Sequence, residues 1–235
     1  MATKKNNFWR KLKKIILACI VLFLASSVLT TIVYRFVNPP ITPLMLIRTT
    51  QQLMKGEALK LKKDWVPIEE ISPNMVRAVV AGEDNLFITH AGFDVKAIAK
   101  AQKYNDRKQG KKIHGGSTIS QQTAKNVFLW PNRSYIRKGL EVYFTVLIEA
   151  FWPKERIMEV YLNVIEMGNG IYGIQTAAET YYGISAKNLS KSQSAMIATI
   201  LPAPRKRNPA HPSSYMYRHQ KRILSLMRKI GPTQF

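Results

Sequence analysis

This chain of 235 residues has a single cysteine and lacks the characteristic motifs of catalytic zinc sites and of serine acyl-transfer enzymes. Each of these shortages excludes a class of protein. The single cysteine, Cys19, excludes a disulfide framework and a cysteine-based metal site. The four histidines show no HExxH or Cys/His spacing, which argues against a catalytic zinc site. No Ser-x-x-Lys or Lys-Thr-Gly motif occurs, and this removes serine acyl-transfer chemistry.

Acidic residues are the second shortage. Only 14 acidic residues stand against 36 basic ones, so the formal net charge is +22 at pH 7. A charge of this size indicates an anionic partner, which is nucleic acid, anionic lipid or a phosphorylated substrate. Composition does not choose among these partners.

The longest uncharged run, residues 15–34, predicts a membrane-spanning helix. Twenty residues at roughly 1.5 Å each cross a hydrocarbon core of about 30 Å. Six basic residues and no acid precede the run, so the positive-inside rule places the N-terminus in the cytoplasm and the rest outside. A cleaved signal peptide with its cleavage site near Ala25–Ser27 is the alternative. The predicted parts are a basic cytoplasmic tail (1–14), a transmembrane helix (15–37), a membrane-proximal connector (38–65) and a catalytic domain (66–235).

The exported part is predicted to be mainly α-helical with one core. Residues 44–63 are basic and amphipathic, which fits either a surface helix or a segment lying on the membrane. The polar residues 105–112 predict a loop, and neither convincing strands nor internal repeats are recognised. Capping residues, prolines and glycines predict helices at 73–83, 94–104, 135–152, 174–182, 191–201 and 213–230. A further helix is predicted to begin near residue 118, and another to resume after Pro153 and extend to about residue 162.

The stretch 83–94 places two adjacent carboxylates, Glu83 and Asp84, at the end of an apolar helix. A carboxylate at the mouth of a basic cleft is a candidate general base. Residues 115–126 run from a glycine-containing loop into a helix start. Their amides, hydroxyls and lysine either hold an anionic or sugar ligand or simply cap the helix.

A third cluster contains a carboxylate among cations. Arg137 and Lys138 lie four and three positions before Glu141, so the three share a helix face, and Arg133 precedes them. The cluster is either an ordinary surface ion pair or a second acidic site whose cations steady a leaving pyrophosphate.

In this order, behind an N-terminal anchor, these segments resemble glycosyltransferase family 51, and in particular its monofunctional peptidoglycan transglycosylases. The resemblance covers about residues 40–210. It rests on Glu83-Asp84-x-x-Phe87-x-x-His90-x-Gly92-x-Asp94, Gly115-Gly116-Ser117-Thr118-Ile119-x-Gln121-Gln122-x-x-Lys125-Asn126, Arg137-Lys138-x-x-Glu141, Glu159-x-Tyr161-Leu162-Asn163 with Gly168-x-Gly170-Ile171-Tyr172-Gly173-Ile174, and Ala195-Met196-Ile197-Ala198 with Leu201-Pro202-Ala203-Pro204.

The resemblance implies a lysozyme-like, two-lobed helical fold and the polymerisation of lipid II at the bacterial cytoplasmic (inner) membrane. Glu83 is then the general base, and Glu141 either orients cations or helps to hold a divalent ion such as Mg²⁺ or Mn²⁺. No organic cofactor is expected. The implied substrate-binding and pyrophosphate-binding residues are Ser117, Thr118, Gln121, Gln122, Lys125, Asn126, Arg133, Arg137 and Lys138, and the supporting residues are Asp84, Phe87, His90, Gly92 and Asp94.

The expected partners are lipid II, the growing glycan chain, the membrane, and proteins of cell division or elongation. A lytic enzyme acting on the same glycan and a non-catalytic scaffold of cell-wall synthesis remain as alternatives. A pyrophosphate-binding cation cluster is unnecessary for glycan cleavage, which disfavours the first. A nucleic-acid partner is not expected, because the predicted topology exports the basic domain and no recognition module is evident.

Overall fold

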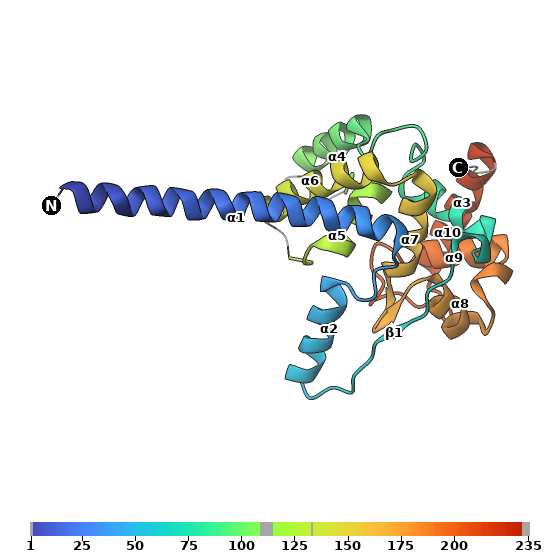
Figure 1. The fold of residues 1–235 in the computed structure, drawn as a ribbon. Coiled ribbons are helices and arrows are strands. Elements are labelled where there is room, and N and C mark those ends of the chain that lie inside the picture. Colours follow the sequence, from blue (N-terminus) through green and yellow to red (C-terminus); the bar gives the residue numbers. More distant parts are fainter. Residues whose placement is uncertain (1, 109–114, 133, 232–235) are drawn as a thin grey trace. The chain divides into compact units, whose positions relative to one another are not determined.

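The computed structural model describes residues 2–108, 115–132 and 134–231 (Figure 1). The chain divides into two compact units, residues 1–38 and 39–235. In the first unit, helix α1 (Ala2–Phe36) contains the uncharged run, and the 28 residues Trp9–Phe36 are long and apolar enough to cross a membrane. Most large apolar side chains of this segment are exposed, as a lipid-facing helix requires.

The second unit is mainly helical, as predicted. Ser72, Asp94, Thr118, Ser134, Ser190 and Ser213 each accept a backbone N–H at a helix start, as N-cap residues do. The helices are α2 (Pro43–Met54), α3 (Pro73–Glu83), α4 (Val95–Arg107), α5 (Ile119–Phe128), α6 (Tyr135–Phe151), α7 (Lys154–Val164), α8 (Ile174–Tyr182), α9 (Lys191–Ala198) and α10 (Ser214–Ile230), with short 3₁₀ turns at Ile68–Glu70 and Ala186–Asn188.

Six helices of this unit pack in two groups. Helix α5 packs against α6 and α7, while α3 packs against α9 and α10 (Figure 1). Helix α7 is buried along most of its length, and Tyr161 and Leu162 are fully enclosed. Burial of the apolar side chains of α7 and its neighbours contributes the main favourable free energy of folding.

The sequence shows no convincing alternating strands, and the structure adds three very short ones to the mainly helical fold. A small sheet has the order β1–β3–β2, made of β1 (Lys62–Lys63), β2 (Glu166–Gly168) and β3 (Ile171–Tyr172). Strands of two or three residues are too short to show an alternating pattern. The turn between β2 and β3 contains Gly170, which has φ +74°. Only glycine fits there, because a Cβ atom would meet the backbone of Lys60.

Two helix ends also differ from prediction. Helix α4 continues to Arg107, into the predicted loop 105–112, and residues 109–112 of that loop lie outside the described residues. Helix α9 ends at Ala198, three residues before the predicted end, because the chain enters tight turns ahead of Pro202.

The amphipathic segment 44–63 is only partly helical. Helix α2 carries Leu44 and Met45 into a buried cluster with Tyr172. The Gln52 side chain then bonds to both backbone groups of Lys60, at 2.7 and 3.3 Å, and ties the return strand to the helix. The segment is therefore an integral part of the second unit, and α2 contributes to the wall of a cavity in that unit.

Candidate active site

Glu83 lies at the C-terminal end of α3, where only part of its surface is exposed. Its Oε2 atom accepts a hydrogen bond of 2.9 Å from Nε2 of Gln122 on α5. Desolvation by burial raises the pKa of Glu83 above the ordinary 4.5, while the Gln122 hydrogen bond and the charges of Lys125 and Arg207 oppose that rise. Glu83 is thus a carboxylate of increased basicity beside a cationic group, as a general base requires.

Asp84 has a different environment and a different task. It is buried, and its carboxylate contacts Nε2 of His90 at 2.9 Å and accepts the Ile119 N–H at 3.0 Å. The second bond uses an amide at the first turn of α5, where a negative charge is favoured by the helix dipole. Asp84 therefore joins the end of α3 to the start of α5.

The other residues of the 83–94 stretch also fix this loop. Phe87 is fully buried and meets the His90 ring edge-on at 6.5 Å. Gly92 has φ +83°, and its carbonyl accepts the Thr118 hydroxyl at 2.7 Å. Asp94 caps α4 by accepting the Ala97 N–H at 2.8 Å. These contacts fix the loop, and the supporting roles of the four residues in catalysis stay a prediction.

Sequence reasoning missed a partly buried network that holds this loop. Lys154 at the start of α7 donates to the His90 carbonyl at 2.6 Å and to Oε1 of Glu149 at 2.7 Å. Glu149 also accepts a short hydrogen bond from Ser120. The only local signal is the five-residue separation of Glu149 and Lys154 across the Pro153 break, which does not identify a pair.

Helix α5 begins with a complete capping box. The Thr118 hydroxyl accepts the Gln121 N–H at 3.1 Å, and Oε1 of Gln121 accepts the Thr118 N–H at 3.1 Å. The side chains of these two residues are used within the cap, so their role in substrate binding stays a prediction. Ser117 precedes the cap and is partly exposed, and its binding role is likewise a prediction.

One turn further along α5, the side chains reach the cavity. Gln122, Lys125 and Asn126 all line it. Gln122 donates to Glu83 and lies 3.4 Å from the hydroxyl of the buried Tyr161, so it is held on both sides. The two interpretations of residues 115–126 are therefore compatible, because a well-capped helix is what presents these polar groups.

The third predicted cluster is not a surface ion pair. Glu141 is 3% exposed, and its Oε2 and Oε1 atoms accept from Arg137 and Lys138, each at 2.5 Å. Burial lowers the pKa of Lys125, and the charges of Glu141 and Glu83 raise it while Arg137 and Lys138 lower it. Lys125 is thus electrostatically coupled to both carboxylates, and the three predicted segments meet around it. Arg133 lies outside the described residues.

The residues near Glu141 do not fit a divalent ion held by protein ligands alone. Both carboxylate oxygens already bind cations. In the part of the chain that the structure describes, no group of three or more His, Cys, Asp or Glu residues could hold a metal ion. Divalent ions prefer several oxygen ligands, and this cluster offers one occupied carboxylate.

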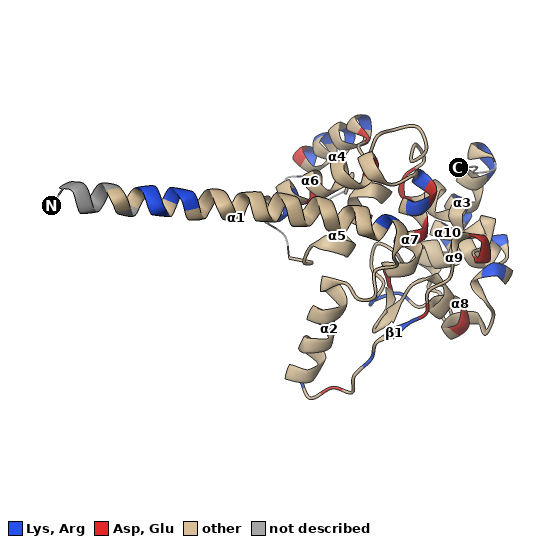
Figure 2. Cartoon of the chain, in the orientation of Figure 1, with Lys and Arg blue, Asp and Glu red and all other residues tan. Residues whose placement is uncertain are grey.

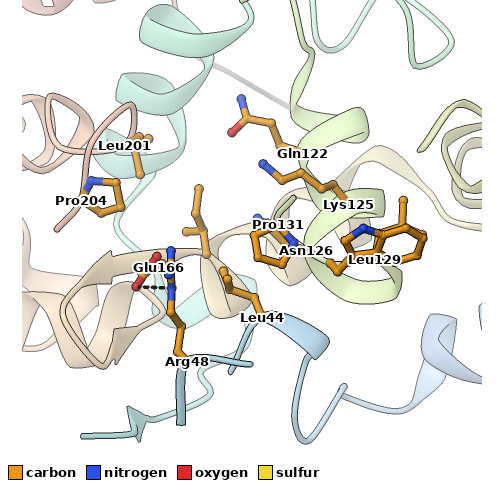
Figure 3. Close-up of a pocket in the computed structure, with 12 residues that line it drawn as sticks. Leu44, Arg48, Gln122, Lys125, Asn126, Leu129, Pro131, Glu166, Leu201 and Pro204 are labelled. Atoms are coloured by element: carbon orange, nitrogen blue, oxygen red, sulfur yellow. Dashed lines mark ion pairs between the residues drawn. The ribbon is translucent and has the colours of Figure 1, made fainter. Parts of the chain in front are cut away.

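The cavity beside α5 has a volume of about 190 Å³. Figure 3 shows Gln122 and Lys125 on one side and the ion pair between Arg48 of α2 and Glu166 of β2 on the other. Burial raises the pKa of Glu166, and Arg48 and Arg205 oppose that rise. Sequence reasoning missed Arg48 and Glu166. The cavity is lined by Leu44, Arg48, Gln122, Lys125, Asn126, Leu129, Trp130, Pro131, Ile165, Glu166, Leu201 and Pro204.

Lysines and arginines are also spread well beyond the cavity. Figure 2 shows them along α4, on α10 and near the start of α1. The local charge at Glu83 and Glu141 is therefore part of a generally basic chain, which favours the approach of anionic ligands.

The second unit is mainly helical and brings a basic carboxylate and several cations together, as in a glycosyl-transferring enzyme, and the first unit contains a helix suited to a membrane. The family model described as Transglycosylase matches residues 50–228, and the chain belongs to this family. The chain is therefore a glycosyltransferase with a lysozyme-like fold, and the resemblance inferred from its motifs is confirmed.

Individual relatives are similar over nearly their whole length. The chain is 52% identical over 217 residues to a biosynthetic peptidoglycan transglycosylase of Bdellovibrio bacteriovorus. The alignment covers 92% of this chain and 86% of that protein. Proteins of the same name from Bacteroides thetaiotaomicron and Caulobacter vibrioides are 54% and 51% identical. These alignments cover 90% and 91% of this chain and 84% and 90% of the relatives.

Proposed function

We propose that this peptidoglycan glycosyltransferase polymerises lipid II into glycan strands at the bacterial cytoplasmic membrane. The chain's family and the names of its relatives support peptidoglycan synthesis. The observation that carries the specific chemistry is the convergence of Glu83 with Lys125 and the Arg137–Lys138–Glu141 cluster in one unit. A lipid-linked pyrophosphate donor needs both a base and cations, and this arrangement supplies both.

In the proposed reaction, Glu83 removes the proton from the 4-hydroxyl of the GlcNAc residue of the acceptor lipid II. The freed oxygen attacks C1 of the MurNAc residue at the end of the donor chain, with inversion at that carbon. The bond from C1 to the phosphate oxygen breaks, and its electron pair leaves with undecaprenyl pyrophosphate. Glu83 carries the proton away, and no covalent glycosyl-enzyme intermediate is needed.

The cations stabilise the departing pyrophosphate. Lys125, Arg137 and Lys138 are held near the two carboxylates, so little reorganisation is needed when negative charge develops on the leaving oxygen. Glu141 holds Arg137 and Lys138 in position. No step is assigned to a metal ion, since Glu141 already binds two cations.

The proposed topology places α1 across the membrane with the basic N-terminus in the cytoplasm and the second unit outside. The uncharged span and its basic flank support this orientation. It puts the second unit on the outer side of the membrane, where a lipid-linked substrate is presented.

The test is polymerisation of labelled lipid II by the purified full chain. We expect glycan strands from the wild type and a loss of about 10²- to 10⁴-fold in rate for Glu83→Gln, because the amide cannot accept the proton. Glu141→Gln should also lower the rate, since Arg137 and Lys138 lose their shared carboxylate. Glu70→Gln is the matched control, because Glu70 is half exposed in a surface ion pair with Lys187.

Other products would identify the alternatives. Release of soluble fragments from peptidoglycan without polymer from lipid II would indicate a lytic enzyme. Full polymerisation by a folded Glu83→Gln protein would contradict the proposed role of the base. Absence of polymer from the wild type, under conditions in which a related transglycosylase is active, would contradict the function itself.

A further inference from the structure

Arg48 and Glu166 form a charged pair that the proposed chemistry does not use. Nε of Arg48 and Oε1 of Glu166 are 3.5 Å apart, and the exposed fractions of the two side chains are 24% and 9%. Both residues line the cavity that also contains Gln122 and Lys125. Tyr172 lies opposite Glu166 in the pairing of β2 with β3 and is fully buried.

The hydrogen-bonding capacity of this cluster is incompletely used. Within the described residues, Arg48 Nε and Glu166 Oε1 face each other at ion-pair distance without forming a hydrogen bond, and the Tyr172 hydroxyl has no hydrogen-bond partner. Eight buried side-chain atoms of the described chain share this condition, and three of them belong to this one cluster. Unsatisfied buried polar groups cost free energy, and each such group in a protein therefore calls for a structural or functional explanation.

The chemistry of the pair selects a neutral hydroxyl group rather than an anion. A guanidinium only donates hydrogen bonds and a carboxylate only accepts them, whereas a hydroxyl does both. Glu166 repels a phosphate or carboxylate, so the pyrophosphate is better placed near Lys125. The remaining walls include Leu44, Trp130 and Leu201, and apolar walls with a few polar groups suit the C–H faces and hydroxyls of a sugar ring.

We propose that Arg48 and Glu166 form a sugar-binding subsite, in which one hydroxyl of the substrate's disaccharide donates to Glu166 and accepts from Arg48. The subsite rests on the proposed function, because that function supplies a saccharide to the cleft. It assigns α2, which precedes the catalytic helices, a direct part in substrate binding. Its effect is on the position of the sugar and does not include proton transfer.

The first test is the double variant Arg48→Met/Glu166→Leu in the full chain. Removing both charges leaves no unpaired buried ion, so the fold should be retained, as its thermal unfolding will show. We expect the KM for lipid II to rise about tenfold while kcat is unchanged, because a binding contact common to ground state and transition state is lost. The single variant Glu166→Gln keeps an acceptor atom and should have a smaller effect. Glu70→Gln is again the control, with wild-type KM.

A second measurement separates a binding role from a structural one. Binding of lipid II and of analogues lacking a single sugar hydroxyl is measured with Glu83→Gln protein, in which turnover is expected to be slowed about 10²- to 10⁴-fold. One analogue should bind this protein about tenfold more weakly than lipid II, and adding the double substitution should abolish the difference.

Equal binding of all the analogues, or a wild-type KM in the folded double variant, would overturn the subsite. Polymer formation by the wild type together with either result would leave the proposed function standing. A wild type that makes no polymer would contradict the proposed function, but the binding measurement would still test the subsite. Failure of the function and failure of the subsite are therefore distinguishable.

Discussion

Glu83 must be ionised to accept a proton, yet its burial favours the protonated form. Gln122 and Lys125 offset part of this penalty, because a hydrogen bond and a positive charge both stabilise the carboxylate. The pKa remains above the ordinary 4.5. Glu83 is therefore a stronger base than an exposed glutamate. Because it becomes protonated at a higher pH, the enzyme should also lose its activity at a higher pH when the medium is acidified.

The pH dependence of kcat/KM tests this balance. We expect activity to increase with pH along an acidic limb whose midpoint lies above 4.5, since Glu83 works only when deprotonated. Gln122→Leu removes the hydrogen bond that lowers the pKa, so the limb should move to still higher pH. The Glu70→Gln protein should keep the wild-type limb. A limb that stays in place in Gln122→Leu would show that the hydrogen bond does not tune the base.

Individual residues differed in how far they were predictable. Glu83, Lys125 and Glu141 were recognised because carboxylates and cations occur in compact local motifs. Arg48 and Glu166 belong to distant segments, and each alone is an ordinary charged residue. Their pairing depends on how α2 lies against the small sheet, which no local pattern reports.

At the scale of elements, the start of α5 organises the site. Its first turn is held by the Thr118 cap and by Asp84, and its next residues present Gln122 and Lys125 to the cavity. Helix α9 begins with the same kind of capping box, formed by Ser190 and Gln193, but Ser190 is exposed. The two helices therefore provide a matched comparison of a cap within the site and a cap outside it.

Thr118→Ala and Ser190→Ala should each destabilise the protein by about 1 kcal/mol through loss of an N-cap. Thr118→Ala should cost roughly 1 kcal/mol more, because its hydroxyl also donates to the buried Gly92 carbonyl. Only Thr118→Ala should lower kcat, since Gln122 and Lys125 follow directly on this helix. Denaturant unfolding and polymerisation rates measure both effects. An equal loss of kcat in the two variants would contradict a specific role for the α5 cap.

Helix starts were the most predictable elements because a cap is a contact between residues two or three positions apart. The starts of α3, α4, α5, α9 and α10 were confirmed on this basis. Ends were less predictable, as α4 and α9 show, because neighbouring segments decide how far a helix continues. The strands were missed because two or three residues are too few to show an alternating pattern, and because β1 pairs with a strand more than 100 residues away in the sequence.

At the scale of the whole molecule, the chain combines a helix able to cross a membrane with a compact unit that contains the site. A shared membrane raises the effective concentration of an enzyme and its lipid-linked substrate, with no new contact between them. The value of α1 should therefore depend on how the substrate is presented.

Deletion of residues 1–38 should lower activity on lipid II in vesicles more than on a short-chain, water-soluble analogue. The second unit should keep its unfolding temperature, because it is compact by itself. Polymerisation rates of the full and shortened chains on both substrates provide the comparison. Equal losses on the two substrates would show that the anchor does not act by bringing enzyme and substrate together.

The sequence by itself determined the apolar span, the mainly helical class, the helix starts and the family, because each depends on composition or on motifs within a few neighbouring residues. The tertiary structure alone decided which side chains meet. Glu83 contacts Gln122 across 39 residues of sequence, and Glu166 reaches Arg48 from a strand that was not predicted. The reason is physical: packing of distant segments determines both the distances between charged groups and their burial, and these set the pKa values and the shape of the cleft.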